Sequence, residues 1–161
     1  IRGRECESFE HTFAEYCGCK HCIGTGNGLD ALTIILKAYC EMGAMQPGDE
    51  IIVPANTYIA TILSIIQAGL RPILCEPCAT SCNIDTTLIE SLVTERTRAI
   101  MPVHLYGLAA DMNSINTIAA KYSLKVIEDV NGDNLILHYD DNGTPKRKYF
   151  TKAGSLWVPL S

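Results

Sequence analysis

Three short segments carry residue types that could hold a flat, phosphorylated ligand. The first, residues 24–28, reads Gly-Thr-Gly-Asn-Gly and precedes a helical pattern. Backbone N–H groups and the positive end of a helix dipole favour a phosphate at such a position. The segment is not a Walker A loop, because no Gly-Lys-Ser/Thr follows it, and it is not G-x-G-x-x-G, because Leu29 stands where the third glycine is needed. A tight turn without chemistry is the alternative interpretation.

The other two segments supply an aromatic ring and a carboxylate. Tyr58 follows a strand-like run that stops at Pro54, and its ring could stack on a flat ligand. Asp129 ends the run Val-Ile-Glu-Asp, where a carboxylate could pair with a cationic ring nitrogen. His104 follows a third apolar run and could act as a base. Each residue taken alone also fits a structural role, such as a helix cap or a buried histidine.

The elements that must position these residues alternate between strand and helix. Helices are predicted at 7–16, 29–42, 57–68, 85–93 and 112–122, and strands at 21–23, 50–53, 71–75, 99–103 and 124–127. Asp111 is the expected N-cap of the last helix, and Gly69 the left-handed residue after the third. This rhythm predicts an α/β domain with a three-layer architecture, a mainly parallel sheet and flanking helices. Ligands bind at the carboxyl ends of such strands.

Composition narrows the classes of function. The chain has 161 residues, of which 47% are hydrophobic, and this is enough for a domain with a core. Its net charge is −5 and it has no long basic run, so neither nucleic acid nor a membrane is an expected partner. No apolar run approaches the length of a transmembrane helix.

Eight cysteines invite a disulfide interpretation. They lie within helix-like and strand-like segments, and no signal peptide precedes them, so we expect reduced thiols in a cytoplasmic protein. Cys17, Cys19 and Cys22 form C-x-C-x-x-C, which leaves a zinc-binding module as an alternative. A structural zinc site needs a fourth ligand, and neither His11 nor His21 stands at a standard spacing.

In this order, the segments resemble the DegT/DnrJ/EryC1/StrS sugar aminotransferases, pyridoxal phosphate (PLP) enzymes of the aspartate aminotransferase fold type I. The resemblance runs from about residue 9 to residue 129, through 24–32, 48–61, 83–85 and 101–107. The sequences of these stretches are most similar to those of enzymes that aminate keto-6-deoxyhexoses carried on dTDP.

The resemblance implies PLP as the cofactor. Asn27 and Gly28 would contact its phosphate, Tyr58 would stack on its ring and Asp129 would pair with its ring nitrogen. The implied reaction transfers an amino group, usually from L-glutamate, to a nucleotide-linked keto-sugar, for deoxyamino-sugar and polysaccharide biosynthesis such as that of O-antigen. The family implies a homodimer whose partner subunit completes each site.

The resemblance stops after Asp129. Gly132 stands where relatives carry Gln or His, and Lys152 lacks the context of the Schiff-base lysine, so no catalytic residue is assigned. We expect residues 1–130 to form the N-terminal part of an incomplete large domain. Residues 131–161 would be a divergent tail, left by a frameshift or truncation, with a hairpin turn at 140–143.

Three alternatives to a sugar aminotransferase stay open. The first is an inactive remnant that binds without catalysis. The second is a related PLP-dependent sugar dehydratase, in which a histidine replaces the lysine, although His138 has no matching context. The third is the zinc-binding module.

Overall fold

The computed structural model describes residues 3–130, 135–139, 145–153 and 156–159, with side chains as far as residue 130. The chain divides into two compact units. One comprises residues 27–133, and the other joins residues 1–26 to residues 134–161. Every candidate residue assigned to the PLP site lies in the first unit.

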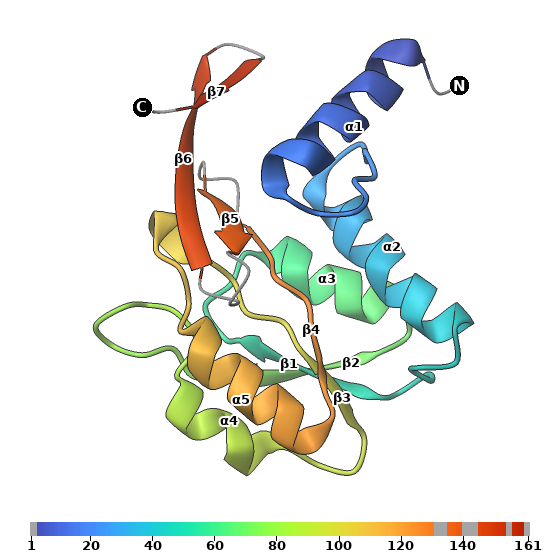
Figure 1. Cartoon of the computed structure of the whole chain (residues 1–161). Helices are drawn as coiled ribbons and strands as arrows, with labels where there is room; N and C mark the ends of the chain where they lie inside the picture. Colours follow the sequence, from blue (N-terminus) through green and yellow to red (C-terminus); the bar gives the residue numbers. More distant parts are fainter. Residues whose placement is uncertain (1–2, 131–134, 140–144, 154–155, 160–161) are drawn as a thin grey trace. The chain divides into compact units, whose positions relative to one another are not determined.

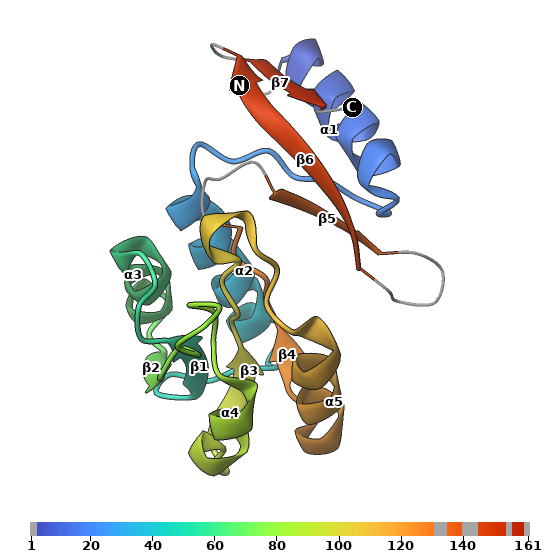
Figure 2. The same ribbon diagram turned by 90° about the vertical axis from the view of Figure 1, so that its left-hand side faces the viewer.

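The unit formed by residues 27–133 is built on a four-stranded parallel sheet. Its strands are β1 (Glu50–Pro54), β2 (Arg71–Cys75), β3 (Thr97–Ile100) and β4 (Lys125–Val126). They are arranged in the order β2-β1-β3-β4, and all three pairings are parallel (Figure 2). Strands that follow each other through a helix and pair in parallel confirm the predicted α/β class.

Helices cover both faces of this sheet (Figure 1). They are α2 (Gly28–Glu41) and α3 (Ile59–Gln67) on one face, and α4 (Thr86–Leu92) and α5 (Met112–Tyr122) on the other. The three-layer architecture expected from the sequence is therefore present. A short 3-10 helix, η1 (Leu105–Gly107), follows β3.

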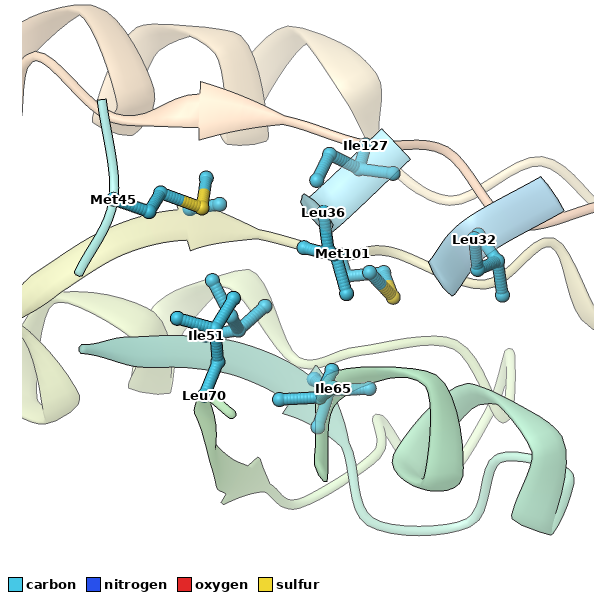
Figure 3. Packing of buried hydrophobic residues seen from close by; sticks show 10 residues of the cluster. Leu32, Leu36, Met45, Ile51, Ile65, Leu70, Met101 and Ile127 are labelled. Atoms are coloured by element: carbon cyan, nitrogen blue, oxygen red, sulfur yellow. The ribbon is translucent and has the colours of Figure 1, made fainter. Parts of the chain in front are cut away.

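Two apolar clusters fill the layers, and β1 contributes to both. Ile51 and Val53 pack with α2 and α3, whereas Ile52, between them, packs with α4 and α5. Side chains alternate across a strand, so an apolar run is buried on both faces. The first cluster, shown in Figure 3, consists of Leu32, Leu36, Met45, Ile51, Val53, Ile65, Leu70, Ala99, Met101 and Ile127. Each fully buried large side chain contributes roughly 1.5–3 kcal/mol.

The predicted helix ends are confirmed where capping residues mark them. Asp111 accepts a hydrogen bond from the backbone N–H of Ser114 at 3.2 Å and caps α5. Gly69 adopts φ 77° directly after the last turn of α3, a conformation that glycine tolerates without strain.

Two buried carboxylates lie at the amino end of the sheet, and both are paired. Asp49 accepts from the Nε of Arg98 at 3.2 Å. Glu50 accepts from the hydroxyl of Thr94 at 2.6 Å and lies 3.7 Å from a guanidinium nitrogen of Arg71. Each of these charges is therefore neutralised by the protein itself.

The second unit begins with helix α1 (Arg4–Cys17), which contains the predicted helix 7–16. The strand predicted at 21–23 is wrong, because no described segment pairs with it and a β-strand exists only through pairing. Ile23 is exposed there. The backbone is held to the helix instead, since the N–H of Gly24 donates to the Glu10 carboxylate at 2.7 Å.

The same unit contains three antiparallel strands, β5 (Leu135–Tyr139), β6 (Pro145–Ala153) and β7 (Leu156–Pro159), in that order. Tyr139 pairs with Pro145, so β5 and β6 form the two arms of a hairpin. The turn predicted at 140–143 lies outside the described residues. Across the described helices of both units, none is long and apolar enough to cross a membrane.

Candidate cofactor site

Asp129 is fixed at the carboxyl end of the parallel sheet. Its N–H donates to the carbonyl of Pro102 at 2.9 Å, and its carbonyl accepts from the N–H of His104 at 3.0 Å. These bonds form a parallel bridge between Asp129 and Val103 beyond the last residues of β3 and β4. The carboxylate therefore lies where α/β sheets bind their ligands.

A chain of two hydroxyl groups connects Asp129 to helix α3. Thr61 donates to Oδ2 of Asp129 at 2.6 Å, and the hydroxyls of Thr57 and Thr61 lie 2.8 Å apart. The single proton of Thr61 goes to the carboxylate, so Thr57 donates to Thr61. Sequence reasoning missed both threonines. Their spacing of four residues, which places them on one side of a helix start, was the available signal.

Burial changes the pKa of Asp129. Removal from water raises the pKa of its carboxyl group, and the hydrogen bond from Thr61 and the nearby His104 lower it by less. Burial disfavours the ionised form, and a cation beside the carboxylate would favour it. Within the described residues, the only side chain that donates to Asp129 is the neutral hydroxyl of Thr61.

Tyr58 stands at the start of α3, one turn from Thr61. It occupies the N-cap position, and its carbonyl accepts from the N–H of Thr61 at 3.0 Å. Its side chain is 64% exposed, so the ring is available for stacking. Tyr58 and Asp129, assigned separately from the sequence, thus meet at the same edge of the sheet through Thr61.

Asn27 and Gly28 form the start of α2. Oδ1 of Asn27 accepts from the backbone N–H of Asp30 at 2.9 Å, which caps the helix. A Cβ added at Gly28 would meet no atom within 4 Å, so the space beside the first turn is open. The first N–H groups of a helix have no partner within the helix. The structure therefore shows Asn27 as a helix cap, next to an open helix terminus suited to an anion.

His104 has a structural role. Its Nδ1 accepts from the N–H of Ala110 at 3.0 Å, and its Nε2 lies 3.0 Å from the Glu128 carboxylate. Only 1% of the residue is exposed. A base needs a free nitrogen within reach of the substrate, so the hypothesis that His104 acts as a base is wrong.

A second exposed aromatic residue lies in the loop that follows His104. Tyr106 is 77% exposed and has φ 55°, a left-handed conformation that is uncommon outside glycine. Asn83 clamps this loop: its Oδ1 accepts from the N–H of Leu105 at 3.1 Å, and its Nδ2 donates to the carbonyl of Leu108 at 2.9 Å. Strained residues cluster at binding sites, yet nothing in the sequence signals the conformation of Tyr106.

The structure does not bring the cysteines of the alternative zinc site into a metal centre. Among the described residues, which include Cys17, Cys19 and Cys22, no three His, Cys, Asp or Glu side chains are placed to hold a metal ion. All eight cysteines are free thiols.

Comparison with known proteins decides the family. The profile of the DegT/DnrJ/EryC1/StrS aminotransferase family matches residues 1–139. The chain belongs to this family. The match covers more than half of the sequence and spans all four residues assigned to the PLP site.

Individual members of the DegT/DnrJ/EryC1/StrS family agree with this assignment. The chain is 58% identical over 129 residues to dTDP-3-amino-3,6-dideoxy-alpha-D-galactopyranose transaminase from Aneurinibacillus thermoaerophilus, covering 80% of this chain and 34% of that protein. The chain thus spans about one third of the length of the curated relatives that it matches.

Two solved structures of similar fold contain PMP or PLP. NtdA from Bacillus subtilis with bound cofactor PMP superposes with a TM-score of 0.74 and 38% identity, over 80% of this chain and 29% of that one. The GDP-4-keto-6-deoxy-D-mannose-3-dehydratase from E. coli with bound hydrated PLP superposes with a TM-score of 0.79 and 27% identity, over 88% of this chain and 36% of that one.

Proposed function

We propose that this chain forms the cofactor-binding N-terminal part of a PLP-dependent aminotransferase that acts on a nucleotide-linked keto-sugar, with L-glutamate as the amino donor. The observation that carries the proposal is Asp129, a partly buried carboxylate at the carboxyl end of the sheet. The names of the relatives support the nucleotide-linked sugar and the amino transfer.

The residues present fit PLP. Burial disfavours the ionised carboxylate of Asp129 and raises its pKa, and a cationic N–H group beside it would offset that cost. A protonated pyridine nitrogen is such a group. PLP, when bound, supplies the electron sink of the reaction. The role of Asp129 is to keep that nitrogen protonated, and the role of Thr61 and Thr57 is to orient the carboxylate.

The other assigned residues complete a non-covalent cradle. The open first turn of α2 at Gly28 receives the phosphate, and Asn27 holds that turn in place through its bond to Asp30. Tyr58, exposed at the start of α3, stacks on the ring. Because these contacts come from two helix starts and one strand end, the sheet fixes their spacing.

Several parts of the proposal extend beyond the cradle. We assign the cradle to residues 1–130 and a divergent tail to residues 131–161, and none of the seven lysines of this chain is assigned as the Schiff-base lysine. A homodimer and a role in polysaccharide biosynthesis follow from the family alone. A cytoplasmic location follows from our interpretation of the eight cysteines as reduced thiols.

A sugar dehydratase is the second candidate, favoured by the likeness to the E. coli enzyme. The Asp129 cradle serves either reaction. A binding protein without catalysis would also use it. A lysine anchor in this chain would favour the aminotransferase over the other two.

The test is a PLP titration of the purified chain, followed by borohydride reduction and peptide mapping. We expect saturable binding without stoichiometric labelling of any single lysine. Binding that does not saturate would overturn the cradle. Stoichiometric labelling of one lysine, Lys152 included, would show that this chain does contain a covalent anchor, and it would leave the proposed cradle intact.

A further inference from the structure

The loop between β2 and α4 is a closed turn with a cysteine at each end. Pro77 and Ile84 form an antiparallel bridge at its base. Inside it, the N–H of Cys78 donates to the carbonyl of Asn83, and the N–H of Cys82 donates to the carbonyl of Cys78, both at 2.8 Å. These bonds hold the two cysteines in one compact turn, and neither thiol belongs to the cofactor site.

The geometry of this turn matches the reach of a disulfide. A bond from Cys82 N–H to Cys78 carbonyl closes a single helix-like turn. Four residues of such a turn advance about 6 Å. Disulfides span Cα separations of roughly 4.4–6.8 Å. Both residues are accessible from outside, because Cys82 is exposed and Cys78 is partly exposed.

The surroundings of Cys78 favour its thiolate. Hydrogen bonds from the side chains and backbone of Thr80 and Ser81 lower the pKa of the Cys78 thiol to about 7. The Sγ of Cys78 lies 3.2 Å from the hydroxyl of Thr80. Cys75, three residues earlier, is the opposite case, because burial raises its pKa to about 11. Cys78 is thus the reactive thiol of this loop, and Cys75 is not a competing partner.

We propose that Cys78 and Cys82 are a thiol-modification site that closes to an intraloop disulfide by exchange with a low-molecular-weight disulfide such as oxidised glutathione. The Cys78 thiolate attacks one glutathione sulfur, which forms a mixed disulfide and releases one glutathione thiolate. The Cys82 thiolate then attacks the Cys78 sulfur and releases the second glutathione. Two loop thiols are oxidised, and one glutathione disulfide is reduced to two thiols.

The modification bears on loops at the carboxyl end of the sheet. The carbonyl of Cys82 accepts from Nδ2 of Asn56 at 2.9 Å, two residues before Tyr58. Cys82 itself has φ 59°, a left-handed conformation that few residues other than glycine adopt. Asn83, its neighbour, holds the loop that bears Tyr106. The disulfide therefore forms next to residues that hold the loops of Tyr58 and Tyr106.

The experiment incubates the full chain with oxidised glutathione at neutral pH, quenches it with acid, alkylates the remaining thiols and maps the products by mass spectrometry. We expect a Cys78–Cys82 disulfide without retained glutathione in the wild type. The variant Cys82→Ser should retain one glutathione on Cys78. Cys6→Ser, which removes an exposed thiol elsewhere, should leave the pattern unchanged.

The rate of the first step gives an independent check. A thiol with a pKa near 7 is about half ionised at pH 7, against about 3% for an ordinary thiol with a pKa of about 8.5. Its lower nucleophilicity leaves a net advantage of about threefold. Cys78 in the chain should therefore react about threefold faster than in a synthetic peptide of residues 76–85. The proposal would be overturned by equal rates in the chain and the peptide, or by glutathione retained on Cys78 of the wild type. A disulfide between Cys78 and a cysteine other than Cys82 would also overturn it.

Discussion

The carboxylates at the two ends of the parallel sheet lie in different surroundings. At the amino end, Asp49 is paired with Arg98, and Glu50 with Thr94 and Arg71. At the carboxyl end, Asp129 receives only the neutral hydroxyl of Thr61 among the described residues. The first arrangement gives each carboxylate an arginine partner, whereas the second gives Asp129 a hydroxyl donor and the nearby His104.

This difference separates a structural role from a binding role. A buried charge is retained only if something compensates for its loss of water. Arginines provide that compensation for Asp49 and Glu50, so these residues serve the fold. For Asp129 we infer that the compensation arrives with the ligand. Matched substitutions at the two ends should therefore change different quantities.

The largest effect is expected for Asp129→Asn. The amide keeps the shape and still accepts from Thr61, but it offers no negative charge to a ring nitrogen. Hydrogen bonds to charged groups contribute about 1.5–3 kcal/mol, so PLP affinity should fall at least about tenfold in a titration followed by absorbance. Asp49→Asn is the control, and an equal loss of affinity there would erase the distinction between the two ends.

Asp49→Asn should instead lower the free energy of unfolding. It removes the charge that faces Arg98, and it weakens the contact with the backbone N–H of Gln46. Arg98 is partly exposed, so we expect a loss of about 1–2 kcal/mol in urea denaturation. Asp129→Asn should show no comparable loss, because burial already disfavours its charge. A stability ranking in the opposite order would contradict the account.

Thr61→Val tests the hydroxyl chain at the carboxyl end. The substitution keeps the volume but leaves Oδ2 of Asp129 without its donor, which should cost about 1 kcal/mol of unfolding free energy. Thr57→Val removes only the outer donor and should cost less. Thermal denaturation of both variants gives the ranking. A larger loss for Thr57→Val would contradict this ranking and the place of Thr61 between Thr57 and Asp129.

The smallest effect is expected at Tyr58. Replacing the ring with alanine should weaken PLP binding about fivefold, since an aromatic stacking pair contributes about 1 kcal/mol. Tyr58→Phe keeps the stacking face and should bind as the wild type does. Unchanged affinity for the alanine variant would remove Tyr58 from the cradle.

The places of the proposed site residues could be predicted from the sequence because these residues lie at the ends of periodic elements, whereas their roles toward PLP were inferred from the family resemblance. Tyr58 and Asp129 follow apolar strands, and Asn27 precedes an amphipathic helix, so the position of each is set by local pattern. Thr61 and Asn83 could not be assigned in this way. Their roles depend on partners 68 and 22 residues away in the chain, at Asp129 and Leu105, and only the packed sheet brings these together.

The sequence pattern failed where pairing decides the structure. Residues 21–23 have the composition of a strand, but composition cannot provide a neighbouring strand. His104 shows the reverse case. The residue type permits a base, and only the bonds from Ala110 and to Glu128 show that both ring nitrogens are occupied.

The central claim is that Asp129 provides the negative charge for a protonated ring nitrogen. NMR of PLP with an isotopically labelled ring nitrogen, bound to the wild type and to Asp129→Asn under saturating conditions, tests it most directly. The account predicts a protonated nitrogen at neutral pH in the wild type and an unprotonated one in the variant. The same protonation state in both proteins would contradict it.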